Sequence, residues 1–296
     1  MNVDRKSEIA KEQANLQSVN GHDREFVFTK KDFDRVCQLI YEHAGISLSA
    51  SKQDMVYSRL ARRLRVNGLD NFRDYLALLE SNNAVEWEAF VNSLTTNLTS
   101  FFREPHHFPM LAEHVARQKG QHCALWCSAA STGEEAYSMA MTMVETFGSF
   151  TPPVSIIASD VDTNVLAKAA EGIYPLESLQ LYSKNYLASG GACSLSDYYH
   201  VKYGAARFDS SLKKRITFSN HNLVEDHAFG EMNMVICRNV MIYFKKELQN
   251  RVLSLFRECL VPKGYLVLGD KENLKFSQVM SSFDVVSEKE KIYRIR

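Results

Sequence analysis

Apolar side chains recur at helical spacing along the first third of the chain. One run starts after Thr29, which resembles a helix cap with Asp32, and carries Phe33, Val36, Ile40 and Ala44 before Gly45 ends it. The same pattern predicts three more helices: about 51–67 with Val56, Leu60 and Leu64 inward, then from a cap at Asp70 through Leu79, then from Val85 to Leu94. Residues 26–97 are therefore predicted to form an all-helical domain, and the polar, aperiodic residues 1–25 a mobile tail.

The pattern changes beyond residue 97. Short continuous apolar runs, typical of strands buried on both faces, alternate with helical stretches. The runs are "CALWCSA", "VSIIASD", "MNMVICRN" and "GYLVLG", and the helical stretches include "EEAYSMAMTMVETF", "TNVLAKAAEG" and "KKELQNRVLSLFREC". Pro105 suits the first turn of a further helix that runs to about Gln118. Residues 98–296 are therefore predicted to form a doubly wound, Rossmann-like α/β domain with a parallel sheet.

One stretch of this second domain, about 175–221, interrupts the alternation. It is polar and rich in Tyr and Ser, and it is too long for a plain loop. We expect an inserted subdomain with a few antiparallel β-strands.

Composition narrows the classes of protein. The 35 basic and 35 acidic residues cancel, so attraction to a nucleic acid or a membrane surface would need a local patch. No apolar stretch approaches ~18 residues, and the N-terminal region lacks the apolar core of a signal peptide. Six scattered cysteines without a CxxC pair favour reduced thiols over disulfides. We therefore expect a cytoplasmic protein that does not enter the membrane.

The turn after the first predicted strand, Ser128 to Gly133, is made of small residues, and Glu134 and Glu135 begin the next helix. Ligands of doubly wound sheets bind outside the carboxyl ends of the strands. Two acidic residues there would repel a pyrophosphate, so a neutral or cationic nucleoside such as the sulfonium S-adenosyl-L-methionine fits better than NAD. A tight turn whose acidic residues favour a helix start explains the same residues without a ligand.

Asp160 ends the second predicted strand of this domain. A carboxylate at that position is placed to accept hydrogen bonds from both ribose hydroxyls of an adenosine-type ligand. The alternative is a purely local role, as the cap of the helix that begins near Thr163.

Four stretches together resemble the CheR-type chemotaxis receptor methyltransferases: "TTNLTSFFREPHHF", "CSAASTGEEAYSMAM", "ASDVDTNVLAKAAEGIYP" and "ICRNVMIYF". The similarity runs in the same order from about residue 27 to the C-terminus. Members of that family methylate glutamate side chains of chemoreceptors with S-adenosyl-L-methionine, and S-adenosyl-L-homocysteine is the product. The resemblance implies a helical receptor-docking domain over 26–97 and a class I methyltransferase domain over 98–296.

The resemblance also implies site residues, and it does so position by position. It assigns cofactor contacts or the reaction centre to Asn97, Thr99 and Arg103, the methionine end to Glu134, the ribose to Asp160, the adenine side to Asn222 and Leu223, and the mouth of the fourth strand to Arg238, Asn239 and Tyr243. The family often has His-Ser-Glu-Asn after the "YLVLG"-like strand, whereas this chain has Asp270-Lys271-Glu272-Asn273. No role is assigned to that turn.

Chemistry selects Arg103 and Tyr243 as the candidate catalytic residues. A glutamate side chain, with a pKa of ~4.3, is ionised at neutral pH and attacks a methyl sulfonium without a general base. The enzyme then needs to align the carboxylate, which arginine and tyrosine donors can do. Two other functions stay open: a signalling adaptor that binds the cofactor without turnover, and a methyltransferase for another acceptor such as RNA.

Three further clusters have alternative explanations. His106, His107 and His114 suggest a metal, but no cluster of cysteines or carboxylates accompanies them at ligand spacing, so we expect helix-surface or packing histidines and no metal site. Phe101 and Phe102 could stack a base, although core packing is favoured. The helix over 51–67 carries a net charge of +4, and we expect its residues Arg59, Arg62 and Arg63 to dock the acidic substrate helix of a receptor, with a solvated face as the alternative. A monomer is expected.

Overall fold

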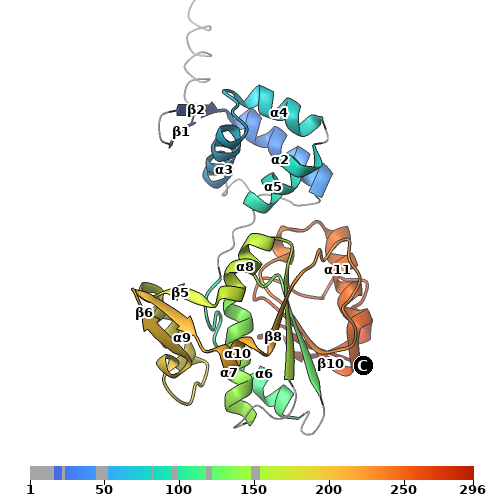
Figure 1. The fold of residues 1–296 in the computed structure, drawn as a ribbon. Coiled ribbons are helices and arrows are strands. Elements are labelled where there is room, and N and C mark those ends of the chain that lie inside the picture. The colour runs from blue at the N-terminus through green and yellow to red at the C-terminus, as the bar shows by residue number, and fades with distance from the viewer. Residues whose placement is uncertain are drawn as a thin grey trace, which may run out of the picture. The chain divides into compact units, whose positions relative to one another are not determined.

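The structure is a computed structural model that describes residues 17–21, 24–44, 53–81, 83–94, 99–117, 122–147 and 154–296. The chain divides into two compact units. One comprises residues 1–96 with 243–245, and the other comprises residues 97–242 with 246–296. Figure 1 draws both units, and each is described separately below.

The first unit is mainly helical, as the sequence predicts. Its elements are β1 (Gln17–Gly21), β2 (Arg24–Phe28), α2 (Lys30–Ala44), α3 (Gln53–Val66), α4 (Phe72–Glu80) and α5 (Ala84–Leu94). The Thr29 hydroxyl accepts from the Asp32 amide, while the Asp32 carboxylate accepts from the Thr29 amide, so α2 starts with the expected capping pair. The cap of α4 is Asn71, whose side chain accepts from the Asp74 amide, and not Asp70.

The hairpin of β1 and β2 is the part of this unit that the sequence does not predict. Residues 17–21 pair antiparallel with residues 24–28, where a mobile tail to residue 25 was expected. Val19 lies opposite Phe26, and Phe26 and Phe28 are buried while Val27 between them is exposed. This alternation is a strand signal, but five residues are too few to stand out from the helical pattern beside them. Residues 1–16 lie outside the described part of the chain.

The second unit has the predicted order of strands and helices. Its elements begin with α6 (His107–Ala116), β3 (Cys123–Ser128), α7 (Glu134–Phe147), β4 (Val154–Asp160), α8 (Thr163–Glu171), β5 (Ile173–Pro175), η2 (Leu176–Ser178), α9 (Leu179–Ala188), η3 (Leu195–Tyr198), β6 (Tyr199–Lys202) and β7 (Ala205–Phe208). They continue with α10 (Ser210–Lys213), β8 (Ile216–Asn220), β9 (Met232–Cys237), η4 (Met241–Tyr243), α11 (Lys246–Cys259), β10 (Leu260–Leu268), η5 (Met280–Ser282), β11 (Phe283–Ser287) and β12 (Ile292–Ile295).

The main sheet has seven strands in the order β11-β12-β10-β9-β3-β4-β8. Strands β8, β4, β3, β9 and β10 run parallel, but β12 pairs antiparallel with both β10 and β11. The sheet is therefore mixed, and the expectation of an entirely parallel sheet is wrong at this edge. A short turn joins β11 to β12, and such a turn permits only antiparallel pairing.

Helices cover both faces of this sheet, as in Figure 1. From the central strands, β3 leads through α7 to β4 in one direction, and β9 leads through α11 to β10 in the other. Right-handed crossovers that run in opposite directions place their helices on opposite faces. The core between these layers contains buried apolar residues of every central strand, among them Leu125, Ile156 and Ile236.

The expected inserted subdomain is a three-stranded antiparallel sheet in the order β5-β7-β6. It is shorter than the 175–221 that the sequence suggests, because β8 (216–220) belongs to the edge of the main sheet, parallel to β4. Glu145 of α7 anchors the insertion, since it accepts hydrogen bonds from the hydroxyls of Tyr186 and Tyr198.

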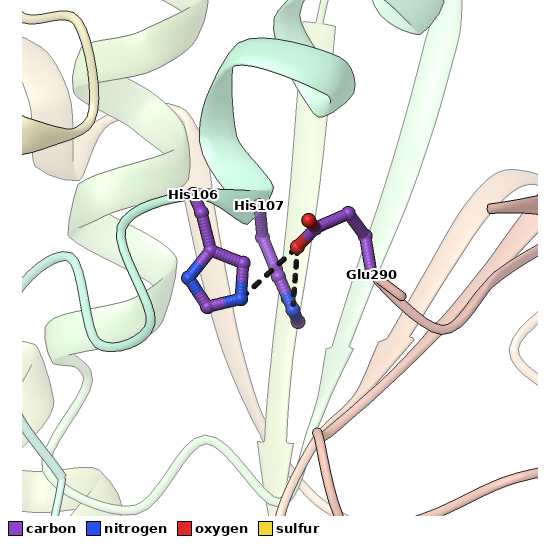
Figure 2. A group of neighbouring side chains, drawn as sticks. All are labelled: His106, His107 and Glu290. Carbon is purple, nitrogen blue, oxygen red and sulfur yellow. Dashed lines mark ion pairs between the residues drawn. The ribbon is translucent and has the colours of Figure 1, made fainter. Parts of the chain in front are cut away.

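Helix α6 begins at His107, two residues later than the start predicted from Pro105. His106 and His107 lead into the helix, with both side chains directed toward Glu290 (Figure 2). Among the described residues, no helix is both long and apolar enough to span a membrane.

Candidate functional site

The strand order of the main sheet reverses between β3 and β9. Ligands of doubly wound folds bind outside the carboxyl ends of the strands at such a point. The two segments that meet there are Ala129–Gly133, after β3, and Arg238–Val240, after β9. The site is therefore built from these two turns and from the turns after β4 and β8, the neighbouring strands.

The turn after β3 is held in an unusual backbone conformation. Ala129, Ser131 and Gly133 have φ values of 58°, 51° and 93°. A Cβ at Gly133 would lie 2.8 Å from Cβ of Ala169, so only glycine allows the turn to pack this closely on α8. The Ser131 hydroxyl is buried and has no hydrogen-bond partner among the described residues. A buried polar atom without a partner is costly, which fits a turn completed by a polar ligand.

Asp160 lies at the end of β4 and faces this turn. Its carboxylate accepts hydrogen bonds from the amide of Ser131 at 2.8 Å and from the amide of Asp162 at 3.0 Å. The cap of α8 is Asp162, whose side chain accepts from the Asn164 amide, so the alternative explanation of Asp160 as that cap is wrong. Burial raises the pKa of Asp160, and the backbone hydrogen bonds only partly offset this. Two amides leave a carboxylate with free acceptor sites, which ribose hydroxyls can use.

Glu134 begins α7 and is 5% exposed. Its carboxylate accepts a hydrogen bond from the Thr132 hydroxyl at 2.7 Å, and burial raises its pKa. Within the described residues Glu134 forms no ion pair, although a buried carboxylate is costly unless it is paired. A cationic group, such as the ammonium of a methionine moiety, would supply the missing partner.

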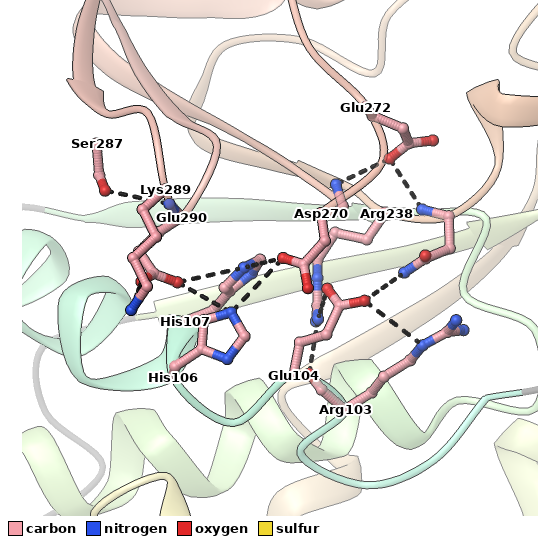
Figure 3. A network of polar contacts seen from close by, with 12 residues as sticks. Arg103, Glu104, His106, His107, Arg238, Asp270, Glu272, Ser287, Lys289 and Glu290 are labelled. Carbon is pink, nitrogen blue, oxygen red and sulfur yellow. Dashed lines mark hydrogen bonds and ion pairs between the residues drawn. The ribbon is translucent and has the colours of Figure 1, made fainter.

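Arg238, directly after β9, joins three segments (Figure 3). Its guanidinium donates to Glu135 of α7 at 2.9 Å, to Glu104 at 2.7 Å and to the carbonyl oxygen of Arg103 at 2.6 Å. Burial raises the pKa of Glu135. For Glu104 burial also acts to raise the pKa, but the attraction and hydrogen bond of Arg238 together with the Asn239 hydrogen bond and nearby His107 outweigh it, and the pKa is lowered. The Arg238 side chain is only 2% exposed, so it connects these three segments and has little surface with which to contact a cofactor.

The turn that carries Arg103 is therefore fixed from several sides. Phe102 and Glu104 on either side of it have φ values of 50° and 54°, which non-glycine residues seldom adopt. The Phe102 amide donates to the Ser138 hydroxyl, and the Asn185 side chain donates to the Phe101 carbonyl. The Arg103 side chain itself is 41% exposed. The backbone is thus restrained while the guanidinium is accessible, which suits a side chain that meets a substrate.

The two phenylalanines of this motif are core residues. Phe101 and Phe102 are 0% and 2% exposed, and the Phe101 ring stacks on Phe208 with centroids 4.5 Å apart. This agrees with the packing explanation and leaves neither ring available to stack a base.

Glu272 is a residue whose role the sequence did not reveal. Its carboxylate accepts hydrogen bonds from four backbone amides, those of Gly269, Asn239, Val240 and Met241. Asn239 has a φ of 63°, and a Cβ at Gly269 would lie 2.9 Å from the Asn239 amide nitrogen. Glu272 therefore fixes the turn after β9. Only its place just past the end of a strand distinguishes it in the sequence, and that signal is weak.

The remaining predicted site residues are placed less tightly. Asn97 lies outside the described residues, and Thr99 is a half-buried loop residue. Asn222 and Leu223 follow β8, where the Asn222 side chain accepts from the Val224 amide at 3.0 Å. Tyr243 ends η4, four positions after Asn239.

Of the three arginines expected to dock a substrate, only two are available on α3. Arg59 is half-buried and Arg62 is exposed, while Val56, Leu60 and Leu64 are buried as predicted. Arg63 pairs through two hydrogen bonds with Glu86 of α5, and its side chain is 17% exposed. Arg63 therefore stabilises the helical unit and does not belong to an exposed stripe. Lys52, which was counted in the +4 charge of the predicted helix, lies outside the described residues.

The histidines are packed as expected, but their surroundings differ from the expectation. His107 and His114 are 0% and 4% exposed, and His114 stacks on Tyr265. Burial is the main cause that lowers the pKa of His107 to about 4. Carboxylates from residues 270 and 290 lie beside His106 and His107, although both residues are distant from these histidines in the sequence.

Comparison with known proteins identifies both units. Residues 97–292 match the CheR methyltransferase, SAM binding domain, and residues 31–95 match the CheR methyltransferase, all-alpha domain. The chain is 46% identical over 256 residues to the chemotaxis protein methyltransferase of Salmonella typhimurium, with 86% of each chain covered. It is 45% identical over 259 residues to chemotaxis protein methyltransferase 2 of Pseudomonas aeruginosa, covering 84% of this chain and 89% of that one.

These matches confirm the predicted fold class and the cofactor, S-adenosyl-L-methionine. They also confirm the resemblance drawn from the four sequence motifs, since the matched regions together include all but five of the residues from 31 to the C-terminus. The chain belongs to the CheR methyltransferase family.

Proposed function

We propose that this protein transfers a methyl group from S-adenosyl-L-methionine to glutamate side chains on the cytoplasmic helices of chemoreceptors, which gives glutamate methyl esters. The observation that carries the proposal is the match to the CheR family in both units, because a cofactor-binding domain alone would fit many methyltransferases. The relatives with which the chain shares 45–46% identity are named as chemotaxis protein methyltransferases.

The cofactor would be held by the turns at the reversal of strand order. Asp160 would accept from the ribose hydroxyls, Glu134 would face the ammonium group, and Asn222 and Leu223 would lie at the adenine. Asn97, Thr99 and Asn239 complete the proposed set. When bound, the cofactor supplies an electrophilic methyl group on a positively charged sulfur.

The remaining chemistry is positioning. A substrate glutamate is ionised at neutral pH, so no side chain of the enzyme has to remove a proton. Arg103 would orient that carboxylate with its exposed guanidinium, and Tyr243 would do so with its hydroxyl. Arg238 would act indirectly, because its bond to the Arg103 carbonyl fixes the backbone from which the guanidinium extends.

We further propose that the protein works in the cytoplasm as a monomer, where receptor helices reach it. Residues 26–97 would dock the receptor, with Arg59 and Arg62 meeting acidic residues on its helix. A non-catalytic adaptor remains the alternative function.

The test incubates the full chain with cofactor labelled in its methyl group and with receptor cytoplasmic fragments, and measures base-labile methyl esters. We expect label in wild type and a loss of more than ~100-fold in turnover for Arg103→Ala, with cofactor affinity nearly unchanged, because a misplaced substrate group costs about that much. The exposed Arg257→Ala, on α11, is the matched control and should label fully.

Two results would contradict the proposal. Cofactor binding without any labelled ester would favour an adaptor, and label in RNA but not in the receptor would favour a different acceptor. If Arg103→Ala keeps its turnover and only its cofactor KM rises, then Arg103 holds the cofactor instead of the substrate.

A further inference from the structure

Two histidines and two carboxylates converge at the start of α6 (Figures 2 and 3). Glu290 Oε2 lies 3.0 Å from His106 Nε2 and 3.6 Å from His107 Nε2. Asp270 Oδ1 lies 3.5 Å and 3.3 Å from the same two nitrogens. The ligating atoms of His106, His107 and Glu290 all lie within 4.8 Å of one another.

These separations correspond to those around a small metal ion. Zinc binds histidine nitrogen and carboxylate oxygen at about 2.0–2.2 Å, and tetrahedral geometry then separates neighbouring ligand atoms by about 3.3–3.5 Å. The four distances, 3.0, 3.3, 3.5 and 3.6 Å, lie around that value. Carboxylates and imidazoles that pack together without an ion would not need to point at one shared position.

Hydrogen bonding accounts for one contact of the cluster, between His107 Nε2 and Asp270 Oδ1 at 3.3 Å, but not for the position of Glu290. Glu290 Oε2 is buried and accepts no hydrogen bond from any described residue, although His106 Nε2 is only 3.0 Å away. His106 Nε2 and Glu290 Oε2 are therefore close to each other, but they are not oriented as the donor and acceptor of a hydrogen bond. Ligands around a cation are arranged in this way, with their lone pairs directed at a third point.

A second group of possible metal ligands lies at the same position, but its carboxylate Glu104 already has partners. Glu104, His107 and Asp270 also lie within ligand distance of one another. However, Glu104 is paired with Arg238 at 2.7 Å and accepts from the Asn239 side chain. Glu290 has a cation, Lys289, only at its other oxygen, Oε1, at 3.2 Å. Glu290 is therefore the carboxylate with an oxygen to offer.

We propose that His106, His107 and Glu290 bind one divalent transition-metal ion of the zinc class, and that Asp270, which lies beside both histidines but outside this group of three, moves in as a fourth ligand. Imidazole and carboxylate ligands in tetrahedral geometry favour this class over calcium or magnesium, which take oxygen ligands. The carboxylates of Glu290 and Asp270 would balance the two positive charges of the ion. His107 Nδ1 has no partner among the described residues, so its ring is not held by a second hydrogen bond, which should weaken binding about 10- to 100-fold relative to a site with that support.

The ion would join segments that are distant in the sequence. It would connect the start of α6 to the turn after β10 and to the turn between β11 and β12. The start of α6 directly follows the turn of Arg103 and Glu104, so metal binding would restrain the base of that turn. This role does not depend on the proposed substrate.

The test titrates the untagged full chain with Zn²⁺ alone, by calorimetry in a buffer that does not chelate metals. We expect one ion per chain, a rise in the unfolding temperature with metal, and visible absorption bands typical of tetrahedral Co²⁺ when cobalt replaces zinc. His106→Ala and Glu290→Gln should each weaken binding more than ~10-fold, the smallest loss seen when even a residue that only supports a ligand is removed.

Matched controls come from the same chain. His200→Ala and Glu288→Gln change an exposed histidine and an exposed glutamate outside the cluster and should leave the affinity unchanged. The His106 side chain is 42% exposed, so its replacement should not prevent folding, and circular dichroism checks this. Absence of saturable binding would overturn the proposal. Equal binding by wild type and both cluster variants would also overturn it, because the ion would then lie at other histidines.

Discussion

Asp160 is the side chain whose replacement should separate cofactor binding from folding. Asp160→Ala removes a carboxylate whose pKa is raised by burial and which keeps free acceptor sites beside its two backbone partners. The loss of charge-assisted hydrogen bonds to the ribose should cost about 1.5–3 kcal/mol, or roughly 10- to 150-fold in affinity for S-adenosyl-L-homocysteine by calorimetry.

The neighbouring Asp162→Ala is the control, because it removes the cap of α8 without touching the turn after β3. It should lower stability by ~1 kcal/mol and leave the affinity unchanged. An Asp160→Ala protein that binds the product as tightly as wild type would limit Asp160 to a local role in the turn.

Arg238 should contribute far more to stability than a surface arginine. Arg238→Met leaves Glu135 and Glu104 without their cation in a site where the arginine side chain is 2% exposed, and breaking such a pair costs about 3–5 kcal/mol. Arg117→Met is the control, because Arg117 and Glu113 form an exposed pair, and its urea midpoint should stay close to that of wild type.

The deficit of Arg238→Met should also depend on pH. Without the arginine, the pKa of Glu104 in the folded protein should rise above its unfolded value, and the pKa of Glu135, which burial already raises, should rise further. The charged carboxylates then destabilise the fold at high pH, and this cost disappears as pH falls through the raised pKa. A deficit that is equal at pH 5 and pH 8 would show that lost packing, not unpaired charge, is the cause.

At the residue scale, the sequence identified side chains by their position relative to strands but not by their partners. Asp160 and Glu134 were found because each lies at the end of a strand or the start of a helix. The carboxylate partners of Arg238 are Glu104 and Glu135. Both lie more than a hundred positions away in the sequence, and no local pattern predicts that pairing. Arg63 illustrates the opposite error, since its helical spacing suggested an exposed stripe while Glu86, 23 positions on, turns it inward.

The pairing of Arg63 with Glu86 joins α3 to α5 and should make the helical unit sensitive to acid. Burial would raise the pKa of Glu86, but hydrogen bonds from Arg63 and Tyr75 outweigh it, and the pKa lies below its usual value. The stabilisation is complete above the ordinary glutamate pKa of ~4.3, and it is lost as pH falls through the lower folded value. Glu86→Gln should remove both the stabilisation and its pH dependence.

The two tryptophans allow this measurement in the full chain. Trp87 lies in α5 and Trp126 in β3, so a Trp126→Phe background makes fluorescence report the helical unit alone. Urea midpoints between pH 3 and pH 7 should fall with acid in that background and stay flat with Glu86→Gln. The control Glu80→Gln removes an exposed partner of Arg35 and should keep the slope of its parent. An unchanged slope in Glu86→Gln would contradict the assignment.

At the element scale, long periodic segments were predictable and short ones were not. The helices α2, α3 and α5 and the strands β3, β4, β9 and β10 follow from apolar periods of several residues. The strands β8, β11 and β12 were missed, because each has only four or five residues and a mixed burial pattern. Their place in the sheet comes from pairing with β4 and β10, which is tertiary information.

For the whole molecule, the distribution of charge should control the meeting with a receptor. The double replacement of Arg59 and Arg62 by Glu should raise KM for receptor fragments steeply, leave cofactor affinity unchanged and flatten the dependence of the wild-type rate on salt. Exposed charges are screened over ~10 Å at 0.1 M salt, so the difference should be largest at low ionic strength.

A matched variant separates the surface from the charge itself. Replacing Lys213 and Lys214 with Glu changes the net charge by the same amount on α10 and beside it, where both side chains are exposed. It should leave KM for the receptor close to wild type. If the two double variants behave alike, only the overall charge matters, and α3 is not the docking surface.

The carboxylate of Glu272 couples the opening of the backbone at the ends of two strands. It accepts from Gly269, at the end of β10, and from Asn239, Val240 and Met241, after β9. All four amides donate to the same carboxylate. If Glu272 moves away so that one amide is exposed to water, the other three amides lose their hydrogen-bond acceptor as well. Their hydrogens should therefore exchange for deuterium on one shared time course, as a single cooperative unit at the edge where the cofactor binds.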